Sequence, residues 1–189
     1  MTDRDRIAAR AEIVFVVQAT TVSQLRAAFP SADDELASAG LQQCRRSSMR
    51  SGRHDVLSAP EPTCVQTVAA LGWPPPRVVS DLRGAEPGEW QGRELASLSP
   101  DQFQHWRAGV APPGGESVAD LLLRVRNFVH GVGGGRYVAV VPQAVARVTV
   151  LVALGLPASK IWEMDADPLS TVAVARRAGG ETRLRLVNL

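Results

Sequence analysis

The sequence predicts an α/β protein: a three-layer α/β/α sandwich with a mostly parallel central sheet. Two continuous runs of β-branched and apolar residues, at 13–17 and 137–141, are typical of strands buried on both faces of a parallel sheet. Helical patterns separate the candidate strands, which is the alternation that builds such a sheet. Near the C-terminus, two short segments flank Ala-Gly-Gly-Glu and indicate a hairpin.

The length and composition suit one domain. The chain has 189 residues, of which 45% are hydrophobic and 21% charged, an ordinary composition for a globular domain with a sizeable core. We expect residues 1–11 to form a flexible lead-in and residues 12–189 to form a single domain. No internal repeat or long linker interrupts it.

The expected elements alternate along the chain. They are strands at 13–17, 55–58, 77–80 and 137–141, helices at 35–46, 62–71, 117–131 and 144–154, and hairpin strands at 171–175 and 182–187. The clearest helix begins at Ser117, which forms a capping-box pattern with Asp120 and precedes apolar residues at helical spacing. Gly72 and the following prolines end the helix at 62–71, and Gly155 ends the one at 144–154.

Composition also excludes several classes of protein. The net charge is only +2 and the arginines are scattered, so we expect no nucleic-acid binding. Cys44 and Cys64 stand alone, which favours a reduced, cytoplasmic protein. The charged N-terminus is not a signal peptide and the longest apolar run near the C-terminus is too short to span a bilayer, so we expect a soluble protein. The three histidines lack ligand spacing, and we expect neither a metal nor a cofactor.

In open α/β sheets, ligands bind beyond the carboxyl ends of the strands. The segments that follow the expected strands therefore contain the candidate site residues. Gln18 and Gln143 stand at the tips of the two most strongly predicted strands. Thr20 and Ser58 lie close to these tips and could bind an anion weakly.

Several segments, in a common order, resemble the histidine phosphatase (phosphoglycerate mutase-like) superfamily. The segments are 15–21 (Arg-His-Gly in the family, after an apolar strand), 36–44, 58–68, 82–92, 113–117 (Pro-Gly-Gly-Glu-Ser, unchanged) and 140–147. The resemblance spans residues 13–150 and implies the phosphoglycerate mutase-like form of the predicted fold. It also implies that the chemistry is lost, because the family's functional positions hold other residues.

Five functional positions of the family are vacated. Val17 and Thr63 stand in place of phosphate-binding arginines, Gln18 in place of the nucleophilic histidine, Gly84 in place of the acid, and Gln143 in place of the second histidine. An amide nitrogen has its lone pair delocalised into the carbonyl, so it cannot form the phosphoenzyme. Loss of one member of such a catalytic unit costs on the order of 10⁶-fold in rate. The resemblance therefore implies a chain with no catalytic residues for phosphate hydrolysis.

Three functions remain open. The first is a pseudophosphatase that binds a small molecule or a protein partner, and the second is a repurposed enzyme that runs a non-phosphatase reaction in the same cleft. The third is a weak phosphatase that acts through water. The candidate ligand-binding residues are Gln18, Thr20, Ser58, Glu86, Gln143 and Arg147. Glu86 and Glu89 lie on the loop that carries Gly84, where acids are usually solvated. Many members of the superfamily dimerise, so a homodimer is also open.

Overall fold

The computed structural model describes residues 10–177 and 180–185. The strands are β1 (Ala11–Val17), β2 (Asp55–Ser58), β3 (Arg77–Val78), β4 (Gly135–Val141), β5 (Thr171–Arg176) and β6 (Thr182–Arg185). The α-helices are α2 (Val22–Leu25), α3 (Ser38–Arg46), α4 (Pro62–Ala70), α5 (Pro100–Arg107), α6 (Val118–Gly131) and α7 (Gln143–Leu154). Short 3₁₀ turns are η1 (Ser80–Leu82), η2 (Gly88–Trp90), η3 (Leu95–Ser97) and η4 (Ala158–Glu163).

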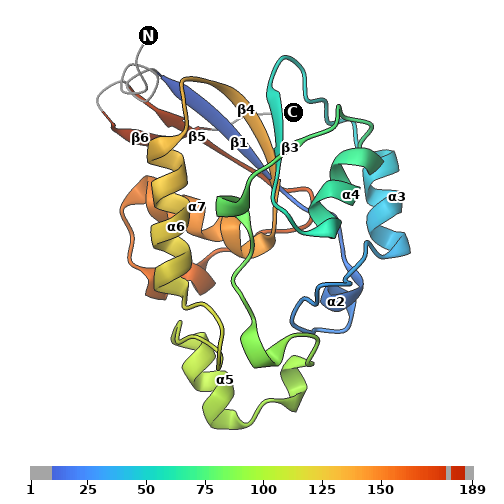
Figure 1. Cartoon of the computed structure of the whole chain (residues 1–189), viewed down its shortest axis with the longest axis vertical. Helices are drawn as coiled ribbons and strands as arrows, with labels where there is room; N and C mark the ends of the chain where they lie inside the picture. Colours follow the sequence, from blue (N-terminus) through green and yellow to red (C-terminus); the bar gives the residue numbers. More distant parts are fainter. Residues whose placement is uncertain (1–9, 178–179, 186–189) are drawn as a thin grey trace.

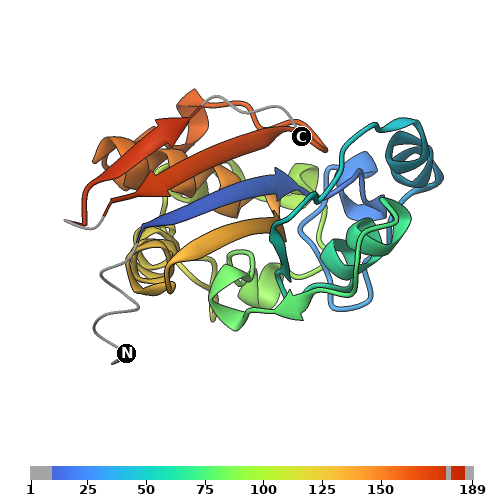
Figure 2. The same ribbon diagram turned by 90° about the horizontal axis from the view of Figure 1, so that it is seen from above.

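The six strands form one sheet in the order β3-β2-β4-β1-β5-β6. The strands β3, β2, β4 and β1 pair in parallel, and β5 pairs with β1 in the antiparallel sense. The antiparallel pair of β5 and β6 extends one edge (Figure 2). The predicted mostly parallel sheet and C-terminal hairpin are confirmed. The residues at 178–179, in its turn, and at 186–187 lie outside the described residues, as do residues 1–9 of the expected lead-in.

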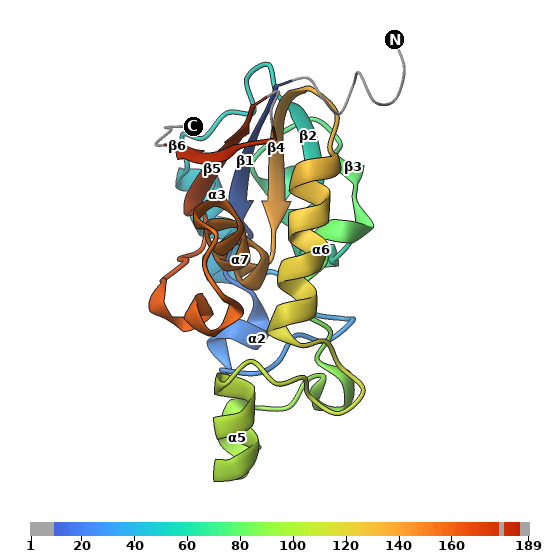
Figure 3. The same ribbon diagram turned by 90° about the vertical axis from the view of Figure 1, so that its left-hand side faces the viewer.

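Helices cover both faces of the sheet, which confirms the three-layer architecture. In Figure 1 the helices α6 and α7 lie on one side and α3 and α4 on the other. The side view in Figure 3 places α6 and α7 in front of the sheet and α3 behind it. Both views place α5 at the far end of the molecule, beyond the carboxyl ends of the parallel strands. In the described part of the chain, no helix has the length and hydropathy needed to cross a membrane.

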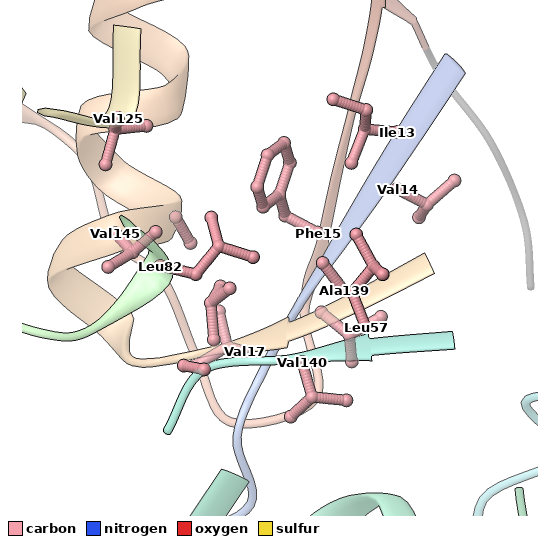
Figure 4. Packing of buried hydrophobic residues seen from close by; sticks show 14 of the residues in the cluster. Ile13, Val14, Phe15, Val17, Leu57, Leu82, Val125, Ala139, Val140 and Val145 are labelled. Atoms are coloured by element: carbon pink, nitrogen blue, oxygen red, sulfur yellow. The ribbon is translucent and has the colours of Figure 1, made fainter. Parts of the chain in front are cut away.

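The core explains why the central strands read as continuous apolar runs. Residues 13–17 of β1 are each at most 1% exposed, as expected for a strand covered on both faces. Phe15 packs edge-to-face against Phe128 of α6, with ring centroids 6.5 Å apart. Figure 4 shows Leu82 lying between Phe15 and Val145 of α7. This packing ties β1 to the helices and fixes where its carboxyl end points.

Several element boundaries differ from the predictions. β1 begins at Ala11, two residues earlier than expected, and Ala11 is fully buried. The helix expected from residue 35 begins at Ser38, because Leu36 instead forms a β-bridge with Thr21. The predicted box at α6 is half formed: the Asp120 backbone N–H donates to Ser117 Oγ at 3.1 Å, and the Ser117 hydroxyl donates to the Asp120 carboxylate.

Candidate functional site

The carboxyl ends of the parallel strands meet at one edge of the sheet. The Gln18 backbone N–H donates to the Val141 carbonyl at 2.9 Å, and the Ala59 N–H donates to the Val140 carbonyl at 2.9 Å. The tips of β1, β2 and β4 are therefore neighbours. Gln18 and Gln143 follow adjacent strand tips, as the sequence predicts.

The side chain of Gln18 is held by the first turn of α4. Its Oε1 accepts a hydrogen bond from the Thr63 hydroxyl at 2.8 Å and another from the Cys64 thiol at 3.0 Å. Only 8% of Gln18 is exposed, and Thr63 and Cys64 are buried. Two positions that the resemblance assigns to a nucleophile and to a phosphate-binding arginine therefore bond to each other.

Polar groups of α4 continue this network. The Thr67 hydroxyl donates to the Thr63 carbonyl at 2.7 Å and accepts from the Ala19 backbone N–H at 3.1 Å. Burial raises the pKa of the Cys64 thiol well above its usual value, and the neighbouring Glu61 carboxylate raises this pKa further. Cys64 is therefore a neutral hydrogen-bond donor rather than a thiolate nucleophile.

A carboxyl group lies beside Gly84. Glu61 Oε1 accepts a hydrogen bond from the Gly84 backbone N–H at 2.6 Å. Glu61 Oε2 is buried and has no hydrogen-bond partner among the described residues. Burial raises the pKa of Glu61 and nearby Glu86 raises it slightly, whereas the Gly84 N–H and the Arg124 charge oppose the rise. A Cβ added at Gly84 would lie 3.3 Å from Glu61 Oε1, so the carboxyl group uses the room that the glycine leaves.

Glu61 is the site residue that sequence reasoning missed. It lies one residue past the Ala-Pro segment at the tip of β2, directly before Pro62 at the start of α4. A carboxylate before a helix that begins with proline could have been found as an acid at the helix N-cap. Its contact with Gly84, 23 residues later, is a tertiary contact that spacing does not encode.

The loop that carries Gly84 is clamped by a buried ion pair. Arg124 of α6 donates to both carboxylate oxygens of Glu116, at 3.0 and 2.5 Å. The same guanidinium donates to the carbonyls of Asp81, Arg83 and Gly84, at 2.8, 2.8 and 3.1 Å. Glu116 belongs to the Pro-Gly-Gly-Glu-Ser segment, which therefore holds the loop in place as well as capping a helix.

The two loop acids considered from the sequence stay at the surface. Glu86 forms an ion pair with Arg83 at 3.3 Å, and 58% of its side chain is exposed. Glu89 in η2 is also exposed. Neither carboxylate takes the place beside Gly84 that Glu61 has.

The Gln143 side chain is held by a hydrogen bond within the protein. Its Nε2 donates to the Ala166 carbonyl at 2.7 Å, in the segment before β5. The ring of Pro142 is instead the group that faces Gly84, because a Cβ at Gly84 would lie 3.4 Å from Pro142 Cγ. At the tip of β4, the structure therefore places an apolar ring where the sequence suggested a second amide.

The two hydroxyl candidates are engaged by the protein itself. The Thr20 hydroxyl donates to Gln43 Oε1 at 2.9 Å, and the buried Ser58 hydroxyl donates to the Ala59 carbonyl at 2.8 Å. An open hollow of about 600 Å³ lies elsewhere, where α3 and the end of α4 adjoin Trp73. The candidate hydroxyl groups near the strand tips therefore form hydrogen bonds within the protein. Arg147, the remaining candidate, lies next to Trp162.

Comparisons with known proteins agree with this architecture. Residues 20–189 match the family model of the histidine phosphatase superfamily (branch 1), a match that begins just after Gln18. The 120 residues that align with a bifunctional protein of Mycobacterium tuberculosis are 28% identical, and they cover 59% of this chain and 33% of that protein. The chain thus spans about a third of that relative's length.

Solved structures share the fold over nearly the whole chain. A mycobacterial glucosyl-3-phosphoglycerate phosphatase has a TM-score of 0.74 at 22% identity, covering 95% of this chain and 99% of its own. A mutant phosphoserine phosphatase from Entamoeba histolytica, in complex with phosphoserine, has a TM-score of 0.80 at 16% identity, with 93% and 95% covered. A protein of Thermus thermophilus has a TM-score of 0.73 at 26% identity, with 93% and 97% covered. The chain belongs to the histidine phosphatase superfamily.

Proposed function

We propose that this chain is a pseudophosphatase: a member of the superfamily that has no phosphohistidine chemistry and serves as a ligand- or partner-binding domain. One observation carries the proposal. The Thr63 hydroxyl donates to Gln18 Oε1 at 2.8 Å in a buried position. In the superfamily that the chain resembles, the position of Thr63 holds a phosphate-binding arginine and the position of Gln18 holds the nucleophilic histidine. Here the two side chains hydrogen-bond to each other, and neither supplies a charge or a nucleophilic nitrogen.

The electrostatics around the tips also oppose phosphate binding. A phosphate dianion at the tip of β1 would meet Gln18 Oε1 and the Glu61 carboxyl group, which are both acceptors when Glu61 is ionised. The guanidinium of Arg124 is already bonded to Glu116 and to loop carbonyls. Val17 and Pro142, on the adjacent strand tips, offer no donor side chain. Such a site lacks the cationic groups that stabilise phosphoryl transfer, because the Gln18 amide offers only neutral N–H donors.

Turnover of p-nitrophenyl phosphate and of phosphorylated metabolites tests the proposal. We expect the wild-type protein and the Gln18→Ala variant to show the same rate, equal to the buffer background. Incubation with labelled substrate followed by denaturation should leave no label on the protein. Robust turnover that disappears in Gln18→Ala, or a trapped phosphoprotein, would refute the proposal. The same assay measures the weak phosphatase that acts through water, which the missing cations disfavour.

The second candidate is an enzyme with a different reaction in the same place. The observation that favours it is Glu61, a partly buried carboxyl group with a raised pKa at the strand tips, which is a common property of acid–base catalysts. A metabolite extract incubated with wild-type protein and with Glu61→Gln distinguishes the two candidates by mass spectrometry. A compound consumed only by the wild type would favour the enzyme. If the extracts incubated with the two proteins are identical, the result would favour a binding domain over an enzyme.

Two further expectations belong to this proposal. Cys44 and Cys64 are both free and buried, which supports a reducing compartment such as the cytoplasm. A homodimer remains an expectation from the superfamily, and sedimentation equilibrium measures it directly.

A further inference from the structure

Two arginines from different elements meet on one tryptophan. The guanidinium carbon of Arg107, at the end of α5, lies 4.9 Å from the ring centroid of Trp162 in η4. The guanidinium carbon of Arg147 in α7 lies 5.5 Å from the same centroid. We call these three residues the Trp162 cluster. Cation–π attraction accounts for each contact singly, but it does not account for two like charges converging on one ring.

The two guanidinium groups of the cluster have no direct ion-pair partner among the described residues. Burial lowers the pKa of Arg147; the charge of Asp165 raises it, and the charge of Arg107 lowers it by less than Asp165 raises it. The Nε of Arg147 is buried without a hydrogen-bond partner among the described residues. The two guanidinium groups thus have hydrogen-bonding capacity that the described protein does not use.

Aromatic packing holds the cluster in place. Trp106 of α5 lies 4.6 Å from Trp162, centroid to centroid, and Phe29 lies 5.4 Å from Trp106. Phe29 also lies 5.4 Å from Trp90, which is only 4% exposed. This chain of rings connects α5 to the body of the protein. A preorganised pair of arginines loses less entropy on binding than two free side chains would.

We propose that the Trp162 cluster is a binding site for an oxyanion, the carboxylate or phosphate group of a small organic ligand. A guanidinium offers a planar fork of donors that matches such a group, and an anion between two forks offsets the repulsion between them. Trp162 adds an apolar surface on which the rest of the ligand can rest. The site is separate from the vacated strand tips, so it does not require phosphatase chemistry.

The position of Arg147 places the cluster one helical turn beyond Gln143 at the tip of β4. Arg147 follows Gln143 by four residues in α7, so both side chains lie on one face of that helix. Arg147 contacts Trp162 in η4, and Gln143 contacts Ala166 in the segment that follows η4. A ligand anchored by its anionic group at the cluster would extend along this face.

Titration with inorganic phosphate and with succinate, followed by NMR of the tryptophan indole and arginine Nε–H signals, tests the proposal. We expect saturable shifts of the Trp162 and Arg147 signals, assigned with Trp162→Phe and Arg147→Gln. Arg107 is exposed, so Arg107→Gln should fold normally and weaken binding about ten- to a hundredfold, the effect of losing one charge-assisted hydrogen bond. Arg46→Gln removes the same charge from exposed α3, on the other face of the sheet, and should leave the affinity unchanged.

The outcomes separate this proposal from the pseudophosphatase. A preference for phosphate or for succinate identifies which oxyanion the ligand carries, and either result supports the site. Absence of a saturable shift with both anions, or equal weakening by Arg107→Gln and Arg46→Gln, would overturn it. Phosphatase turnover would overturn the pseudophosphatase while leaving the binding result unchanged.

Discussion

Replacing Arg124 with methionine should destabilise the protein severely, because the arginine is the centre of a buried network. Five of its hydrogen bonds are seen, two to Glu116 and three to the carbonyls of residues 81, 83 and 84. The side chains of Arg124 and Glu116 are only 11% and 10% exposed. In Arg124→Met, Arg83, at 3.7 Å, is the one cation among the described residues that remains within ion-pair distance of the Glu116 carboxylate. Methionine keeps much of the side-chain volume, so lost charge and hydrogen bonds dominate the effect.

The expected loss is about 3–5 kcal/mol of unfolding free energy, the range for one partner removed from a buried pair. For a domain of this size, that loss corresponds to a decrease of roughly 6–20 °C in Tm. Urea denaturation followed by circular dichroism measures the free energy, and calorimetry measures the Tm.

A double-mutant cycle isolates the charge effect. Glu116→Gln combined with Arg124→Met removes the uncompensated carboxylate, so the double variant should recover part of the stability that the single variant loses. A single-variant loss below about 1 kcal/mol would refute the reasoning, because that is the value of a solvent-screened surface pair. Losses that simply add in the double variant would also contradict it.

Three further predictions concern the site and the core. Burial raises the pKa of Glu61 above its ordinary 4.5, so the folded state binds this proton more tightly than the unfolded state. The stability that the proton contributes is lost as pH rises through the folded-state pKa. Glu61→Gln should therefore gain stability relative to wild type as pH rises above 4.5, about 1.4 kcal/mol per unit of pKa elevation, in urea titrations at each pH. Gly40→Ala places a Cβ 2.2 Å from the Thr20 carbonyl oxygen and should cost about 1–3 kcal/mol, whereas Gly131→Ala, with no atom within 4 Å, should leave Tm nearly unchanged. Phe15→Ala empties a fully buried site against Phe128 and should cost about 3–5 kcal/mol by urea denaturation.

The central fold could be predicted from the sequence because burial on both faces leaves an unambiguous pattern. The strands at the centre of the sheet consist of apolar runs, and α6 has both a capping serine and a periodic apolar face. α5 was not among the expected helices because its apolar residues are few, chiefly Phe103 and Trp106, and none of its residues is fully buried. Its start nevertheless has a complete capping box, Ser99 with Gln102 around Pro100, which is a readable signal.

The direction of each site side chain could not be predicted in the same way. Strand ends identify which residues reach the edge of the sheet, and Gln18 lies there as expected. The direction of Gln143 depends on the Ala166 carbonyl, which the long segment before β5 supplies from 23 residues away. Arg107 and Arg147 meet only because η4 places Trp162 between α5 and α7. Such contacts are set by tertiary packing and leave no trace in local spacing.

The altered positions at the strand tips act as coupled pairs rather than as independent losses. Thr63 and Gln18 bond to each other, so an arginine introduced at 63 alone would leave Gln18 Oε1 without its hydroxyl donor. A side chain introduced at Gly84 would compete for space with Glu61, whose Oε1 is 3.3 Å from the Cβ position. Restoring the family's residue at one position would therefore disturb its partner. Under the proposed pseudophosphatase function, we expect phosphatase activity to appear only when both members of each pair change together, and Gly84→Glu would require a smaller residue at 61.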